Sequence, residues 1–107
     1  MKWLNKVQLI GYLGKDPDIQ ILPTGFYFAT LYVATNSGYT NENKKRITSW
    51  HRVRIWGKKP QYIRDLFIKG SHVMVDGQIV YKTFLDKDGK KCSVAEIKAD
   101  KLLNLDR

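Results

Sequence analysis

The chain has 107 residues, 43% of them hydrophobic and 12% aromatic, which excludes intrinsic disorder over most of its length and predicts one domain, residues 1–107, with a single core. An excess of 19 Lys and Arg residues over 10 Asp and Glu residues gives a net charge of +9, which favours a polyanionic partner, nucleic acid ahead of an anionic membrane. The single cysteine, Cys92, excludes an internal disulfide framework and fits a reducing compartment.

Two strands are predicted in the first third of the chain. The first spans residues 4–13, where Gly11 indicates a sharp bend or a close backbone approach. Residues 19–22 form a short extended piece before a tight turn at residues 23–25. The second strand spans residues 26–35, and the period of two divides its side chains between two faces. The apolar face carries Ala29, Leu31 and Val33, and the opposite face carries Phe28, Thr30 and Tyr32.

The polar connection at residues 36–47 leaves two interpretations open. It is either a flexible loop or a continuation of the flanking strands as a long hairpin. It contains Tyr39 and the basic residues Lys44, Lys45 and Arg46. An aromatic residue beside a basic cluster makes this segment a candidate arm for wrapping a nucleic acid.

The third strand, residues 48–57, has the most informative pattern. Its core face carries His51, Val53 and Ile55, and its other face carries Trp50, Arg52, Arg54 and Trp56. Aromatic rings alternating with guanidinium groups are suited to stacking bases between phosphate contacts. The alternative is that both tryptophans pack beneath a neighbouring loop with the arginines covering them.

One helix and two strands complete the chain. The helix is predicted at residues 60–68, where Pro60 suits the first turn and Gly70 the end. Strands follow at residues 71–85 and 90–99, and the leucines beyond them are expected to pack back onto the domain. This order predicts an all-β OB-fold with one short helix. It is a five-stranded barrel with the helix between strands 3 and 4, a fold that binds oligonucleotides.

The sequence from Asn5 to Leu103 resembles the bacterial-type single-stranded DNA-binding proteins. Its most specific element is Trp50–Val53 followed by Gly57 and Lys58. The other matching segments are Asn5–Val7, Gly11–Pro17, Leu31–Thr35, Lys69–Ser71, Asp76–Gln78 and Asp86–Gly89. Each segment alone is a weak signal, and their joint order and spacing carry the resemblance.

The resemblance also suggests which side chains contact DNA. By position, the stacking residues are Tyr39, Trp50, Trp56 and Phe84, and the phosphate contacts are Lys6, Arg52 and Lys82. The family often has tryptophan at the positions of Tyr39 and Phe84, and a basic residue at that of Val80. The strand patterns and the basic cluster add Tyr32, Arg54, Lys44, Lys45 and Arg46 to the predicted interface.

The resemblance implies a cytoplasmic, nucleoid-associated protein that binds single-stranded DNA without strong sequence preference. It would protect that DNA during replication, recombination and repair, and it would act as a homotetramer. Many family members end in an acidic tail that recruits repair enzymes. This sequence stops at Arg107 without one, so replication and repair proteins are candidate partners, but their recruitment through such a tail is not predicted.

Two other classes of function are less favoured. The carboxylates form no metal-binding cluster, and there is no triad order, phosphate loop or cofactor fingerprint, so no enzyme activity, metal or cofactor is predicted. His51 lies on the inward face and is interpreted as a hydrogen-bonded core or interface histidine. A protein-interaction module of the same fold, such as a primosome accessory protein, is the alternative, and it would bind single-stranded DNA only weakly. No apolar run has membrane-spanning length, so no membrane partner is expected.

Overall fold

The computed structural model of the chain describes residues 2–39, 42 and 45–106. Within these ranges the chain forms six strands and one helix: β1 (Val7–Leu13), β2 (Asp18–Ile21), β3 (Tyr27–Tyr39), β4 (Arg46–Gly57), α1 (Pro60–Leu66), β5 (His72–Leu85) and β6 (Lys91–Asn104). A search of these residues finds no helix with the length and apolar character needed to cross a membrane.

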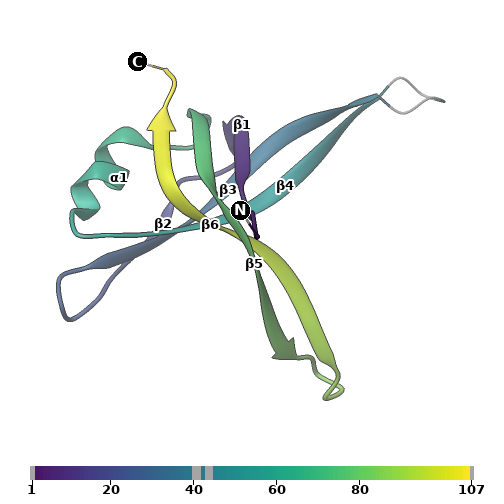
Figure 1. The fold of residues 1–107 in the computed structure, drawn as a ribbon. Coiled ribbons are helices and arrows are strands. Elements are labelled where there is room, and N and C mark those ends of the chain that lie inside the picture. The colour runs from purple at the N-terminus through teal and green to yellow at the C-terminus, as the bar shows by residue number, and fades with distance from the viewer. Residues whose placement is uncertain (1, 40–41, 43–44, 107) are drawn as a thin grey trace.

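Five of the strands close into a barrel. β1 pairs with β5 from Val7 to Tyr12 and with β3 through Tyr12 and Leu13, so the sheet order β1-β5-β6-β4-β3 returns to β1. The sixth strand, β2, pairs with β3 and corresponds to the extended piece predicted at residues 19–22. The helix lies between β4 and β5, the third and fourth barrel strands (Figure 1). The predicted OB-fold is therefore confirmed.

Alternate residues of the strands fill the barrel interior. Its most deeply buried large side chains are Phe67, Leu31, Ile63, Val33, Val53, Val73 and Val75. Ile63 comes from α1 and Phe67 from the residue that follows it, so the helix region plugs the barrel with two side chains. The core faces predicted for the second and third strands are confirmed, because a period of two places every other side chain on the same face of a strand.

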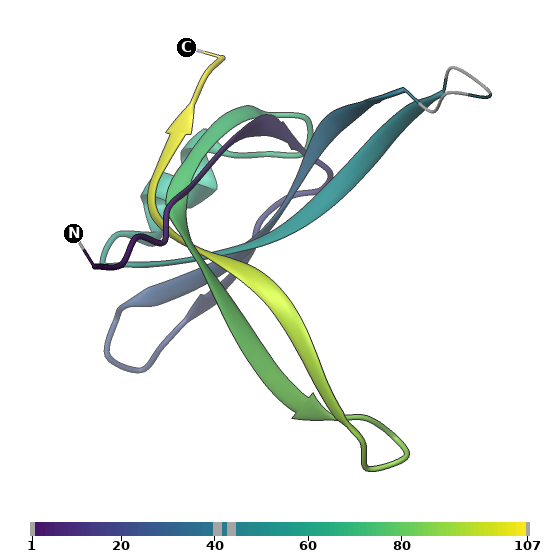
Figure 2. The same cartoon turned by 45° about the vertical axis from the view of Figure 1, so that its right-hand side comes forward.

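Two long hairpins extend beyond the barrel and point in different directions (Figures 1 and 2). One joins β3 and β4, whose pairing continues to Tyr39 and Arg46 after an irregularity at Asn36. In its described part the connection therefore continues the two strands as the long hairpin, which favours this interpretation over the flexible loop. The other joins β5 and β6, which stay paired out to Leu85 and Lys91. Residues 40–41 and 43–44, including Lys44, lie outside the described residues.

Several predicted boundaries are wrong. The first strand begins at Val7 instead of residue 4. The helix ends at Leu66, because Phe67 already has an extended conformation. The last strand continues to Asn104 instead of ending at residue 99, because the β5–β6 register shifts by one residue beside Gly77 and pairing then resumes. Of the three terminal leucines, Leu102 is in the core, whereas Leu105 is exposed.

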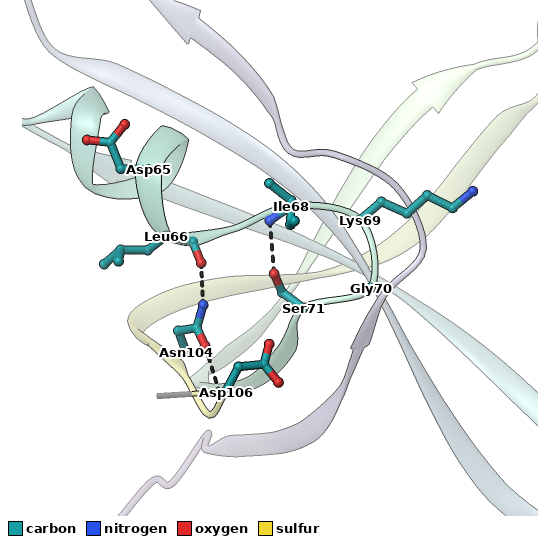
Figure 3. Close-up of a pocket in the computed structure, with 8 residues that line it drawn as sticks. All are labelled: Asp65, Leu66, Ile68, Lys69, Gly70, Ser71, Asn104 and Asp106. Atoms are coloured by element: carbon teal, nitrogen blue, oxygen red, sulfur yellow. Dashed lines mark hydrogen bonds between the residues drawn. The ribbon is translucent and has the colours of Figure 1, made fainter.

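The end of β6 anchors the end of the helix (Figure 3). The Asn104 side chain donates to the Leu66 carbonyl oxygen and accepts from the Asp106 backbone N–H. The Ile68 N–H donates to Ser71 Oγ at 2.9 Å. A hollow beside these residues is thus bordered by polar groups that already bind one another. We therefore interpret this hollow as a structural feature of the barrel end.

The close approach of strands at Gly77 gives a test of the barrel. A Cβ on Gly77 would clash with the Lys98 carbonyl oxygen of the neighbouring strand. We expect Gly77→Ala to lower the free energy of unfolding by about 1–3 kcal/mol, the usual cost of overpacking. Urea denaturation followed by circular dichroism measures it. Ser93→Ala, at an exposed β6 position, should change stability by less than about 0.5 kcal/mol. Equal denaturation midpoints for Gly77→Ala and the wild type would contradict the close approach.

Candidate nucleic-acid interface

The outer faces of β3 and β4 form one surface of aromatic rings and cations. Directly opposed residues in paired strands lie on the same face of a sheet. The register pairs Trp50 with Ala34, Arg52 with Tyr32, Arg54 with Thr30 and Trp56 with Phe28. Trp50 is 60% exposed and Trp56 is 56% exposed. The alternative in which both tryptophans pack beneath a loop is therefore wrong. We call these outer faces of β3 and β4, from Phe28 to Ala34 and from Trp50 to Trp56, the aromatic face.

Contacts within the aromatic face hold its rings in place. The Phe28 and Trp56 rings lie 4.9 Å apart between centroids, and the Arg54 guanidinium carbon lies 5.0 Å from the Phe28 centroid. Lys15 Nζ lies 4.5 Å from the centroid of Tyr32. Cations over ring faces at these distances are attracted by the ring quadrupole. Positively charged side chains therefore already lie beside these rings in the free protein.

Trp50 rests against the backbone of the loop after β1. A Cβ on Gly14 would collide with the six-membered ring of Trp50. Gly14, Lys15, Tyr32 and Trp50 line a shared hollow beside this contact. Glycine is therefore needed at position 14 for the indole to lie over the loop, which fixes one side of the ring and leaves the rest exposed.

Glu96 is the main feature of this site that sequence reasoning missed. Its side chain is only 3% exposed, and three cations surround it. Arg52 Nε lies 2.9 Å from Glu96 Oε2, while Lys82 Nζ and Arg54 Nη1 lie 3.5 and 3.7 Å from Oε1. Three predicted DNA-contacting cations therefore share one buried carboxylate. Pattern reasoning left the faces of residues 90–99 unassigned, so it gave Glu96 no role.

The β5–β6 hairpin continues the surface away from the barrel. Register places Val80 opposite Glu96, Lys82 opposite Val94, and Phe84 opposite Cys92. Lys82 and Phe84 therefore share a face with Glu96, and Phe84 is 49% exposed. Val80, where the family often has a basic residue, is half-buried. The structure thus brings Lys82 and Phe84 to the side of the arm that continues the aromatic face.

The remaining predicted residues lie at the margins. Lys6 is exposed and precedes β1, and its neighbour Val7 lines a hollow with Trp50 and Arg52, so the start of β1 lies near the aromatic face. Lys45 and Arg46 are exposed on the β3–β4 hairpin. Tyr39 is paired with Arg46 through the backbone, and its side chain is outside the described part, as is the whole of Lys44. The roles of these residues in binding stay predictions.

Other candidate chemistry is accounted for within the chain. His51 Nε2 lies 2.9 Å from Thr35 Oγ1, which agrees with its interpretation as a hydrogen-bonded inward histidine. Burial raises the pKa of Tyr27, and nearby Tyr62 adds to this effect. Among the described residues, no group of three or more His, Cys, Asp or Glu side chains is arranged to hold a metal ion.

Comparisons with known proteins agree with this geometry. Residues 4–105 match the profile of the "Single-strand binding protein family". "Single-stranded DNA-binding protein 2" of Listeria monocytogenes is 35% identical over 91% of this chain and 61% of its own length, so the chain spans about three fifths of that relative. "Single-stranded DNA-binding protein 1" of Xylella fastidiosa is 37% identical over 95% of this chain and 77% of its own length. The structure titled "Plasmodium falciparum SSB complex with ssDNA" superposes with a TM-score of 0.83 at 31% identity. That superposition covers 98% of this chain and 97% of the other.

The shared carboxylate gives a test of how the cations are held. We expect Glu96→Gln to lower the free energy of unfolding by about 1–3 kcal/mol at low salt. This is less than the cost of breaking a fully buried pair, because Arg52 and Lys82 are about half exposed and water screens them. Urea denaturation at several salt concentrations measures the difference. The difference in the free energy of unfolding between Glu96→Gln and the wild type should become smaller as the salt concentration rises, since screening weakens repulsion among the three cations.

The control for this test is Asp65→Asn, which removes an exposed carboxylate on α1. We expect this change to leave stability within about 0.5 kcal/mol of the wild type. A Glu96→Gln protein as stable as the wild type at low salt would show that the carboxylate does not hold the cations.

Proposed function

This chain belongs to the single-strand binding protein family, and we propose that it binds single-stranded DNA without strong sequence preference. The observation that carries the proposal is the aromatic face, where Trp50 and Trp56 are exposed beside Arg52 and Arg54. The proteins named in the comparisons as single-stranded DNA-binding support the same ligand.

Binding in this mode combines stacking with phosphate contacts. Bases of a single strand stack on the exposed rings of Trp50, Trp56 and Phe84, and the cations between the rings contact the phosphates. Stacking uses the π-face that every base has, so it contributes about 1–3 kcal/mol per base with little sequence preference. A duplex keeps its bases stacked on one another and offers no free π-face to these rings. The surface therefore selects single strands by the state of their bases.

Glu96 adjusts the charge of this surface. One carboxylate against three cations leaves a local charge of about +2, which still attracts phosphate. The carboxylate also orients Arg52 through a 2.9 Å contact, so this guanidinium is placed before DNA arrives. We propose that Glu96 lowers the number of phosphates neutralised here and so moderates the dependence of affinity on salt.

The proteins of this family bind DNA and are not enzymes. We propose that the chain protects single-stranded DNA during replication, recombination and repair, and that it acts on the DNA of the nucleoid. The supporting observations are the family relationship and the exposed, basic aromatic face. The alternative, a protein-interaction module that binds single strands only weakly, is favoured by no particular feature of this surface.

We propose that the chain assembles as a homotetramer. Among the described residues, β1 pairs with β3 only through Tyr12 and Leu13, so the stretch from Val7 to Gly11 has no partner strand on that side. Ile10 and Tyr12 are 59% and 55% exposed on the outer face of the same strand. An apolar strand with an unpaired edge favours association, and closed symmetric pairing covers it.

The stacking proposal is tested by Trp50→Ala. Because Trp50 is mostly exposed, its loss should spare the fold and weaken binding of oligo(dT) by about 1–3 kcal/mol if the ring stacks on a base. Fluorescence anisotropy of a labelled oligonucleotide at fixed salt measures the affinity. Trp3→Ala is the matched control, since Trp3 is exposed outside the aromatic face. Unchanged affinity in Trp50→Ala would remove the ring from the binding mechanism. Weak binding by the wild type would favour the protein-interaction module.

The assembly proposal is tested by analytical ultracentrifugation at neutral pH and micromolar concentration. We expect a tetramer for the wild type and smaller species for Ile10→Lys, because a charge at a covered apolar position opposes association. Ile68→Lys is the control, since Ile68 is similarly exposed but lies beyond α1. A wild-type monomer would contradict the assembly. A tetrameric Ile10→Lys protein would exclude this face of β1 from the interface.

A further inference from the structure

An apolar hollow lies where the aromatic face ends. Its lining combines three residues of the β2–β3 hairpin with three consecutive residues at the end of β4. These are Leu22, Phe26 and Tyr27, and Trp56, Gly57 and Lys58. Two of the lining rings remain open to solvent, with Phe26 at 44% and Trp56 at 56% exposed. The hollow therefore offers ring faces that the barrel itself does not use.

The hollow is preformed. The Leu22 N–H donates to the Phe26 carbonyl oxygen at 2.7 Å, and the Gly25 N–H donates to the Leu22 carbonyl oxygen at 2.9 Å. Gly25 has φ +89°, which allows this tight turn. The Tyr27 ring packs on Gly57, where a Cβ would lie 2.6 Å from the ring. Hydrogen bonds and backbone packing thus hold the residues that line the hollow.

The hollow is continuous with the aromatic face. Trp56 lines the hollow and also contacts Phe28, which carries Arg54 over its ring. Lys58 is exposed at the hollow, so a cation adjoins the apolar lining. A ligand that fits both features has an apolar, flat part and an adjoining negative charge. A nucleotide within a single strand meets both requirements, with its base on the rings and its phosphate beside Lys58.

We propose that this hollow is an additional nucleobase subsite, in which a base of the bound strand stacks on Phe26 beside Trp56 and its phosphate contacts Lys58. The inference rests on the proposed function and extends the track of the strand past Trp56, around the end of β4 and onto the β2–β3 hairpin. Stacking explains why aromatic side chains are exposed here. The charge at Lys58 favours a nucleotide over the uncharged apolar side chain of a partner protein.

The test compares oligo(dT) affinities of the full chain by fluorescence anisotropy at fixed salt. We expect Phe26→Ala to weaken binding about fivefold or more, the lower end of the effect of losing one stacked base. Ile21→Ala is the matched control, because Ile21 is an exposed apolar residue of the same hairpin outside the hollow. We expect the oligo(dT) affinity of Ile21→Ala to stay within about twofold of the wild type, because Ile21 lies outside the proposed contact with DNA.

A second measurement on the wild type does not depend on variant folding. Oligo(dT) carrying 5-iododeoxyuridine is cross-linked by light, and the modified peptide is identified by mass spectrometry. We expect a cross-link at Phe26, the exposed ring of the hairpin, in addition to the residues of the aromatic face.

The outcomes separate this inference from the proposed function. Weakened binding in Phe26→Ala together with a cross-link in the hairpin supports the subsite. Unchanged affinity in Phe26→Ala, with weakened binding in Trp50→Ala, overturns the subsite and leaves the proposed function standing. If Phe26→Ala leaves the DNA affinity unchanged but abolishes binding of a protein partner, the hollow is a protein contact. This outcome also overturns the nucleobase subsite. No binding of oligo(dT) by the wild type rejects the proposed function itself.

Discussion

Closure of the barrel is the constraint on which the rest of the structure depends. β1 must pair with both β5 and β3, which leaves no room for a side chain at Gly11, and the bend where β5 meets β6 leaves none at Gly77. At Gly11 a Cβ would meet the Ala34 carbonyl, and at Gly77 it would meet that of Lys98. With the ends of the sheet joined, the outer faces of β3, β4 and β6 become one curved surface. The proposed binding surface is therefore a consequence of how the core closes.

The buried carboxylate of Glu96 connects this architecture to the chemistry of the surface. It accepts contacts from β4 through Arg52 and Arg54 and from β5 through Lys82, so it ties the barrel to the base of an extended arm. A carboxylate that is 3% exposed needs cationic neighbours, and cations on a crowded face need an anion to limit their repulsion. The same contacts therefore serve both stability and the placement of charge on the proposed binding surface.

The proposed binding surface follows a defined path over the barrel. The aromatic face runs along β4 from Trp50 to Trp56, the β5–β6 arm continues it on one side, and the hollow at Phe26 adjoins its end beside Trp56. The Trp50 ring, held by packing against Gly14, loses little conformational entropy on binding, because it is ordered beforehand. Along β4 a strand on this path meets two arginines flanked by two tryptophans, so rings for its bases lie beside cations for its phosphates.

The sequence by itself determined the faces of β3 and β4, the barrel order and the rings and cations of β4, because the period of two is a local property that the chain shows residue by residue. It also identified the hairpin turn and the short helix, through glycine and proline. Only the tertiary structure decided the length of the β3–β4 hairpin, the extension of β6 to Asn104 and the role of Glu96. These depend on the register between paired strands, which no single stretch of sequence shows. Glu96 meets Arg52 only after two strands pair in parallel and a third fixes their alignment, and no local pattern specifies that alignment.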